Sequence, residues 1–175
     1  QSVGRLDLAD RPVNVRITQR GLRAAVAPAR GPISVIDTVT GRVVARHPRP
    51  FNRNGLDISQ DGTRLLDPIA SGGIDILDTA TGERVWSIGP VDGTTYPAAT
   101  LVRTAAFVTS REVLLVRRDS TCELWTQGQS TPTATWKTTL NNFNALKVSG
   151  DGSLAALGFD SRLCIINPRT GDTLA

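Results

Sequence analysis

Three observations predict an all-β fold, a β-propeller: a segment that recurs along the chain, a second marker that keeps the same period, and strand-like runs too short for helices. In the recurring segment an aliphatic strand ends in a polar turn. The residue that opens this turn is Asp37, Asp78, Thr126 and Asn167 in the four copies, at spacings of 41, 48 and 41. A repeat of this length is one supersecondary unit, so the chain is expected to hold about four such units.

The second marker supports the period and supplies turn chemistry. Gly21, Gly62 and Gly152 each close a short polar turn before an aliphatic run, and the first two lie 41 residues apart. Asp and Gly tolerate the positive φ that a tight hairpin demands, and the Asp of an Asp-Thr-x-Thr-Gly segment accepts from backbone N–H groups two residues on. Both markers are therefore interpreted as turns and not as catalytic motifs.

Each unit contains four short runs rich in aliphatic residues, and no amphipathic helical stretch interrupts them. The expected strands are 13–18, 22–27, 33–37 and 42–47, then 55–59, 63–67, 74–78 and 83–88, then 104–109, 113–117, 121–125 and 133–138, and finally 144–149, 153–158, 162–166 and 172–175. A four-stranded sheet cannot bury both of its faces alone, and radial stacking of such sheets solves this in a propeller. One domain, 1–175, is expected, with blades at 13–48, 55–90, 104–138 and 144–175.

The phase of the repeat brings the two ends of the chain into one blade. Shifting the first unit back by 41 residues places 1–8 on an outer strand, whereas the last outer strand has barely begun at 172–175. The first strand would then complete the blade made by the last three, which removes exposed sheet edges. Two arrangements satisfy this phase: four blades that close on themselves, or part of a larger ring that another chain or missing sequence completes.

Composition describes a core-forming chain. Of its 175 residues 39% are hydrophobic and 21% charged, and no run approaches the roughly 18 apolar residues of a membrane span. Met is absent, so the chain is expected to be trimmed or cut from something longer. Cys122 and Cys164 are expected on opposite strand faces, as reduced thiols. Reduced thiols favour an intracellular origin, although a removed signal peptide would also leave a start without Met.

The second unit has its strands and turns in a definite order. Residues 59–62 read Ser-Gln-Asp-Gly, a second strand follows, and the next strand ends at Asp78 before Thr81-Gly82. This order resembles a WD40 repeat. The first unit is also similar to the YVTN-type propellers of bacterial surface proteins. The chain departs from the WD40 pattern in having one His, His47, and no Trp-Asp pair. The hydrogen-bonded brace of that family is therefore expected to be absent or residual.

Motifs for catalysis are missing. A single His excludes multi-His metal sites, and the chain has no Gly-x-Ser-x-Gly elbow, phosphate-binding loop, dinucleotide fingerprint or EF-hand loop. No enzyme activity, cofactor or metal is therefore expected. The favoured function is a non-catalytic interaction module that scaffolds protein–protein contacts through its rim loops. Two alternatives stay open: a nucleic-acid or ribonucleoprotein-associated propeller that uses the basic first blade, and a fragment of a propeller enzyme.

Positive charge is concentrated at the start of the chain. The net charge is +4, yet residues 1–53 hold ten Arg against three Asp, a balance of +7, and residues 54–175 hold ten basic and thirteen acidic groups, a balance of −3. Such asymmetry can mark a surface for an acidic protein or for nucleic acid.

The candidate contact surface is the rim around the link between the first two blades. Two prolines keep residues 46–53 extended, Arg side chains pair with carboxylates or phosphates, and Phe51 adds an apolar anchor. The turns between second and third strands are expected on the same rim, and the insertion 89–103 is a second candidate contact. The candidate residues are Arg30, Arg46, His47, Arg49, Phe51, Arg53, Tyr96, Asp119 and Asp160. The partner expected for this surface is acidic.

Overall fold

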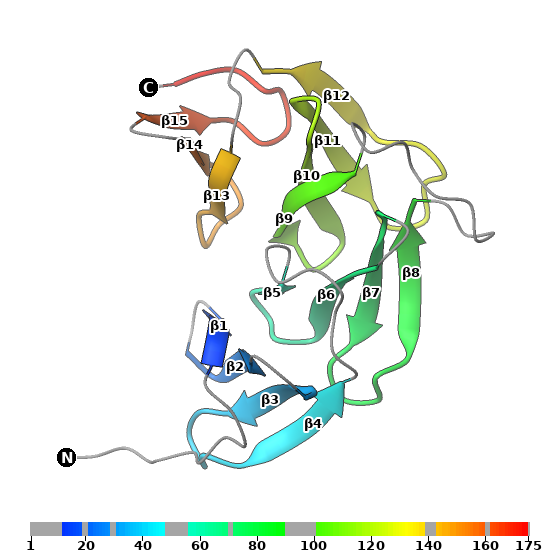
Figure 1. Ribbon diagram of the computed structural model, residues 1–175, viewed down its shortest axis with the longest axis vertical. Helices are drawn as coiled ribbons and strands as arrows, with labels where there is room; N and C mark the ends of the chain where they lie inside the picture. Colours follow the sequence, from blue (N-terminus) through cyan, green and yellow to red (C-terminus); the bar gives the residue numbers. More distant parts are fainter. Residues whose placement is uncertain are drawn as a thin grey trace.

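The computed structural model describes most of the chain. The described residues are 12–18, 21–28, 31–47, 56–69, 72–89, 101–138, 143–159 and 162–174. All regular secondary structure in these ranges is β-strand. None of the ranges holds a helix long and apolar enough to cross a membrane. The strands form three four-stranded sheets and one three-stranded sheet, set radially like the blades of a propeller (Figure 1). The all-β propeller that the repeat predicts is confirmed.

Each blade runs outward from an inner strand, and every strand is antiparallel to its neighbour. Blade 1 contains β1 (Pro12–Ile17), β2 (Arg23–Pro28), β3 (Ile33–Asp37) and β4 (Val43–His47). Blade 2 contains β5 (Asp57–Ile58), β6 (Arg64–Pro68), β7 (Ile74–Asp78) and β8 (Arg84–Ile88). Blade 3 contains β9 (Val102–Thr109), β10 (Glu112–Arg117), β11 (Thr121–Thr126) and β12 (Ala134–Lys137). Blade 4 contains β13 (Phe143–Val148), β14 (Ala155–Phe159) and β15 (Arg162–Ile166), with a single bridge from Ile166 to Thr173 where its outer strand is expected.

The hydrophobic core is divided into three clusters, one between each pair of neighbouring blades. Successive side chains of a strand point to opposite faces of its sheet, so each blade has a backward face toward the blade before it and a forward face toward the blade after it. The first cluster contains Ala25, Ala27, Ile33, Val35, Leu56, Ile58, Leu65 and Leu77. The second contains Leu66, Ile74, Ile76, Ile88, Val102, Ala105, Phe107, Val113, Leu115 and Trp125. The third contains Ala106, Val108, Leu114, Val116, Cys122, Leu124, Leu146, Ala155, Leu157 and Ile166.

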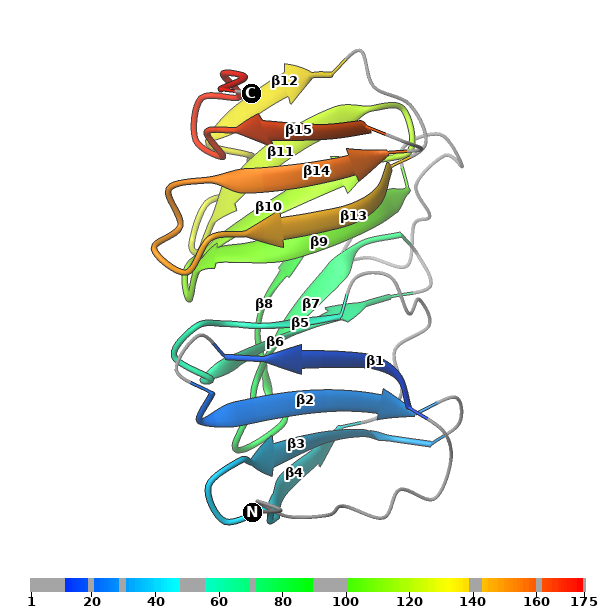
Figure 2. The same cartoon turned by 90° about the vertical axis from the view of Figure 1, so that its left-hand side faces the viewer.

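The four blades form an arc that is open on one side (Figures 1 and 2). The inner strands β1, β5, β9 and β13 line its concave side, and blades 1 and 4 stand at its two ends. As far as the described residues show, the blades do not close on themselves. The closing strand expected at 1–8 lies outside the described residues.

The two cysteines lie at the boundary between blades 3 and 4. Both are free thiols, as expected. Cys122 is fully buried between blades 3 and 4, however, and Cys164 packs against the same cluster. The two residues do lie on opposite faces, but the forward face of one blade meets the backward face of the next. Opposite faces of successive blades therefore meet in one boundary, and both thiols contact the same cluster.

Candidate functional site

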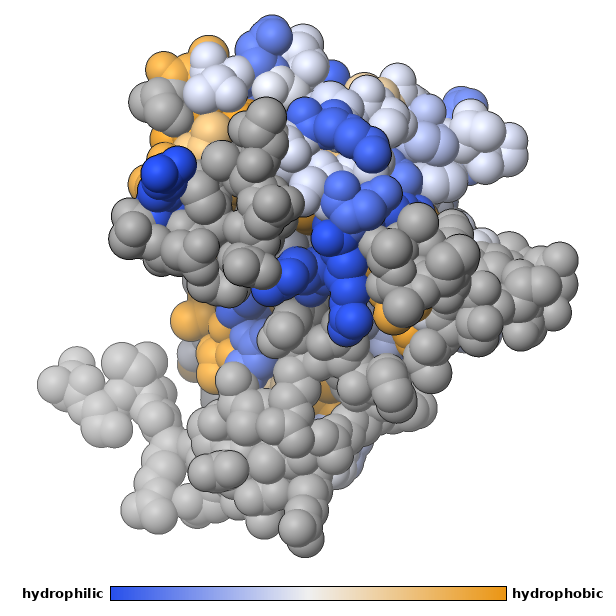
Figure 3. Space-filling model, turned by 45° about the horizontal axis from the view of Figure 1, so that its top comes forward, coloured by the Kyte–Doolittle hydropathy of each residue, from blue (hydrophilic) through white to orange (hydrophobic). Residues whose placement is uncertain are grey.

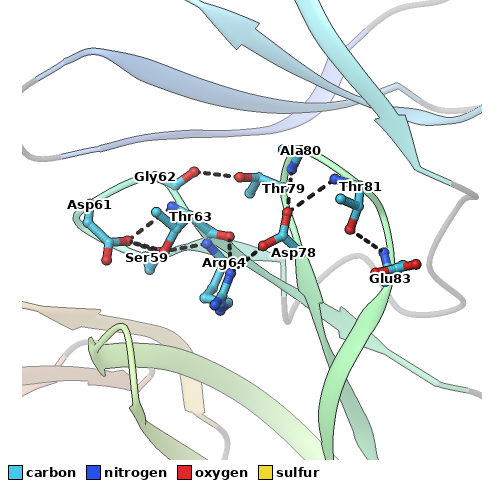
Figure 4. A network of polar contacts seen from close by, with 10 residues as sticks. All are labelled: Ser59, Asp61, Gly62, Thr63, Arg64, Asp78, Thr79, Ala80, Thr81 and Glu83. Atoms are coloured by element: carbon cyan, nitrogen blue, oxygen red, sulfur yellow. Dashed lines mark hydrogen bonds and ion pairs between the residues drawn. The ribbon is translucent and has the colours of Figure 1, made fainter.

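The turn after the third strand of a blade is held together by its own polar side chains. In blade 2, Oδ1 of Asp78 accepts a hydrogen bond from the backbone N–H of Thr81 (3.1 Å), and Oδ2 accepts one from Nη1 of Arg64 (2.5 Å). Backbone N–H groups and the guanidinium hold the pKa of this carboxyl below its usual range. The hydroxyl of Thr79 donates to the carbonyl of Gly62 (2.7 Å) and ties the turn to the hairpin between β5 and β6 (Figure 4).

Blade 1 repeats this arrangement one period earlier. The carboxylate of Asp37 accepts from the backbone N–H of Thr40 (2.9 Å) and pairs with the guanidinium of Arg23. These two contacts lower the pKa of Asp37 to about 2. The hydroxyl of Thr38 donates to the carbonyl of Gly21. The carboxylates of this turn are therefore held in their ionised form by hydrogen bonds and ion pairs within their own blade.

The hairpin between the first two strands has a second brace. In blade 2, Oδ1 of Asp61 accepts from the hydroxyl of Ser59 (2.6 Å). In blade 4, Asp151 accepts from the hydroxyl of Ser149 (2.6 Å) and from the backbone N–H of Ser153 (3.0 Å). These hydrogen bonds lower the pKa of Asp151 to about 2. The prediction that both repeat markers are turn chemistry is confirmed.

Charged side chains that no turn uses line the concave side of the arc. An open cavity of about 260 Å³ lies there, lined by residues of all four inner strands and of the hairpins that follow β1, β5 and β13. The charged residues in its wall are Arg16 on β1, Asp57 on β5 and Lys147 on β13. Within the described ranges, no three His, Cys, Asp or Glu side chains are placed to share a metal ion. The cavity is the candidate functional site.

Asp57 connects three blades at this cavity. Its Oδ2 accepts a hydrogen bond from the backbone N–H of Phe107 in the next blade (2.9 Å), and its Oδ1 lies 3.8 Å from Nε of Arg16 in the blade before. Burial raises the pKa of Asp57, while the Phe107 N–H and the two cations act in the opposite direction. Lys147 reaches solvent, yet partial burial and then the charge of Arg16 lower its pKa. With two cations to one carboxylate, the cavity wall carries excess positive charge at neutral pH.

The structure describes three of the nine candidate contact residues. Arg46 and His47 end β4, and Asp119 lies in the turn between β10 and β11. Outside the described residues lie Arg30, Arg49, Phe51, Arg53, Tyr96 and Asp160. Arg46 is exposed. The basic rim therefore stays a prediction.

His47 is buried, which corrects the expectation that it belongs to an exposed cluster. A Cβ built on Gly82, in the third-strand turn of blade 2, would lie 3.2 Å from Nδ1 of His47, so the ring packs directly on this turn. Trp136 packs in the same way on Gly171, and both members of this pair lie 89 residues after their counterparts. The repeat thus uses this position for a ring against the next blade. Burial lowers the pKa of His47 and favours its neutral form.

Asp119 is a turn brace in blade 3. It accepts from the backbone N–H of Thr121 (3.0 Å), beside Ser120, whose φ is +66°. Burial acts to raise its pKa, but the hydrogen bonds from Thr121 and the charges of Lys137 and Arg117 hold it below its ordinary value. Its carboxylate is therefore occupied within its own blade.

Sequence reasoning missed the charged residues of the cavity, although the repeat contains a signal for them. Arg16 and Asp57 lie 41 residues apart, and so do Ala106 and Lys147. The four residues share one position on the four inner strands, and inner-strand positions surround the central channel of a propeller. A comparison of charges at equivalent inner positions would have found the site.

The comparisons with known proteins agree with the fold. No protein-family model and no curated protein matches the chain. Among solved structures it is similar to the β-propeller domain of Cps50 (Swd1) from Myceliophteria thermophila, with a TM-score of 0.66 and 16% sequence identity. The likeness shows a β-propeller fold. It covers 99% of this chain and 57% of that chain, so this chain spans little more than half the length of the domain it resembles. The WD40 pattern of the sequence stays a resemblance.

Proposed function

We propose that the protein is a non-catalytic β-propeller interaction module that binds an acidic protein segment at the cavity on the concave side of the arc. One observation carries the proposal: Arg16 and Lys147, from blades 1 and 4, line a cavity whose wall holds one carboxylate, Asp57. A concave site with excess positive charge attracts anionic groups, and Arg pairs well with carboxylates.

The same geometry argues against the alternative of a propeller enzyme. Acid–base catalysis needs a proton donor or acceptor within reach of a reacting atom, and nucleophilic catalysis needs a nucleophile beside its base. The carboxylate of Asp57 accepts from the N–H of Phe107 and lies beside the guanidinium of Arg16. The turn carboxylates Asp37 and Asp151 have pKa values of about 2 and are hydrogen-bonded inside their turns. These groups suit binding and folding better than chemistry.

An acidic protein segment is favoured over nucleic acid because of where the aromatic rings lie. Proteins that bind single strands stack bases on aromatic side chains beside cations. Phe107 and Trp125 are buried, and Trp86 and Trp136 pack against the clusters between blades. Among the side chains that the structure describes, no exposed aromatic ring accompanies the cavity cations.

The basic rim offers a second contact for the same class of partner. Arg46 is exposed at the end of β4, and Arg49 and Arg53 follow it closely in the sequence. Reversal of these three charges should weaken capture of an acidic partner in a pull-down. Unchanged capture would show that the rim does not contact the partner, and the cavity would then be the proposed contact.

Titration calorimetry with a hexaglutamate peptide at low salt tests the cavity. Lys147→Gln should weaken binding about five-fold, because loss of one charge contact removes about 1 kcal/mol. Asp57→Asn should strengthen binding by a similar factor, since the side-chain carbonyl can still accept from the Phe107 N–H while the negative charge is gone. Lys137→Gln, on the outer strand β12, is the matched control and should leave the affinity unchanged.

Three results would count against the proposal. Binding that responds to neither Lys147→Gln nor Asp57→Asn would place the acidic contact elsewhere. Binding that responds equally to Lys137→Gln would show only attraction to the net charge of the chain. Tighter binding of a single-stranded oligonucleotide than of hexaglutamate at equal salt would favour the nucleic-acid alternative.

A further inference from the structure

The boundaries between neighbouring blades use the same positions of the repeat. The forward face of blade 1 contributes Ile33 and Val35 to the first boundary. The backward face of blade 2 contributes Leu65 and Leu77 to it, and all four side chains are buried. The other two boundaries have the same plan. Contact between two blades therefore joins one forward face to one backward face.

Blade 1 has a backward face that no described blade covers. Val15 and Ile17 lie on this free backward face, and they are 45% and 61% exposed. Their equivalents 41 residues later, Leu56 and Ile58, are 1% and 5% exposed in the boundary between blades 1 and 2. Aliphatic side chains at a position that the repeat elsewhere buries are thus left in solvent.

Blade 4 has the complementary surface, a free forward face. Leu163 lies on it and is 65% exposed. The residues equivalent to Leu163 in blades 1, 2 and 3 are Ile33, Ile74 and Cys122, each fully buried. Figure 3 shows hydrophobic residues in orange along the left-hand side, which is the side on which the arc is open.

We propose that a second copy of this chain closes the arc, with the free forward face of each blade 4 packed on the free backward face of the other copy's blade 1. An occupant that covers both ends must offer a forward face to blade 1 and a backward face to blade 4. The chain carries one of each, and no described blade covers either of them. Two copies related by a twofold axis therefore cover all four faces in two identical boundaries. The product is an eight-bladed ring, within the usual range of about four to eight blades.

Light scattering and sedimentation velocity on the 175-residue chain test this inference. The ring has a mass of about 37 kDa, twice 18.7 kDa, and does not grow with concentration because no end face is left. Ile17→Glu and Leu163→Glu each place a charge in both boundaries, so each variant should be an 18.7 kDa monomer. Val39→Glu is the control, because Val39 is 70% exposed in the third-strand turn and lies on neither end face.

Mixing the two variants distinguishes specific ring closure from non-specific association of exposed apolar surfaces. In a mixed pair, one boundary joins the two unaltered faces while the other holds both glutamates. The mixture should associate at least about ten-fold more tightly than either variant alone. A wild-type monomer up to about 200 µM, assemblies that grow with concentration, or a mixture no tighter than its components would overturn the proposal. Ile17→Thr and Leu163→Thr replace any glutamate variant whose circular dichroism shows loss of the sheet.

Discussion

The carboxyl of Asp67 gives a stability prediction with a definite sign. Asp67 faces Asp75 across β6 and β7, and its Oδ1 is buried with no hydrogen-bond partner among the described residues. Burial, and then the charge of Asp75, raise the pKa of Asp67 to about 6. A raised pKa means that the folded state favours the protonated form. The contribution of this group to stability is therefore complete below its unfolded pKa of 3.8 and is lost as the pH rises through 6.

Asp67→Asn removes the free-energy cost of ionising this buried carboxyl in the folded state. The shift from 3.8 to about 6 corresponds to about 3 kcal/mol above pH 6. Solvent access to the partly exposed side chain lowers the expected gain to about 1–3 kcal/mol. The new amide can also donate to the carboxylate of Asp75. The variant should therefore be more stable than the wild type at high pH and close to it in acid.

Urea denaturation gives the free energy of unfolding of the variant and of the wild type at about pH 4.5 and about pH 8. The effect is the gain of the variant over the wild type at the higher pH minus its gain at the lower pH. This design removes the contribution of His47, which has the opposite sign. The lowered pKa of His47 gives stability that is present above its unfolded pKa of 6.5 and is lost as the pH falls. A gain of equal size at both pH values, or a variant less stable at high pH, would refute the reasoning.

Two other predictions rest on close packing between blades 3 and 4. Gly171→Ala should destabilise the fold by about 2–4 kcal/mol in thermal unfolding, because its φ is +79° and a Cβ would lie 2.7 Å from the ring of Trp136. Gly41→Ala, with φ +69° and nothing within 4 Å, should cost only about 1 kcal/mol, and equal losses would contradict the packing argument. In timed alkylation followed by mass spectrometry, the thiol of Cys122 should react far more slowly than that of Cys164, since burial raises the pKa of Cys122 to about 12. Equal rates would show that the boundary opens readily.

Strands and turns could be predicted from the sequence because the forces that specify them are local. The side chain of Asp78 binds backbone groups two and three residues ahead, and the turn glycines take positive φ at Gly62 and Gly82. A repeated pattern of residue types is enough to place such turns. The strands between them follow from short aliphatic runs, so most observed bounds lie close to the expected ones. The outer strand expected at 172–175 is the exception, with a single bridge at Thr173.

Contacts between blades could not be predicted in the same way, since they depend on which face of one unit meets which face of the next. His47 sits among Arg and Pro in the sequence and is expected in solvent, yet its ring packs on Gly82 in the next blade. The cysteines show the same limit, because opposite faces of successive blades share one cluster. The repeat does place Arg16 and Lys147 at one inner position, but that blades 1 and 4 bring them to the same cavity follows only from the curvature of the arc.

Two positions of the repeat carry the functional argument, one that varies in charge between the units and one that stays apolar but differs in burial. The inner position holds Arg16, Asp57, Ala106 and Lys147 in the four units. The boundary position at Leu163 is different, because it is apolar in every unit, although in blade 4 no described blade covers it. Leu163 is exposed where its counterparts in the other three blades are fully buried, and this contrast is the reason for proposing a second copy at the end face. A closed pair of copies would double the charges around the axis to four cations and two carboxylates. Ring closure would place more positive charge around the channel and so strengthen binding of an acidic segment. By thermodynamic linkage, a bound acidic segment would in turn stabilise the closed ring.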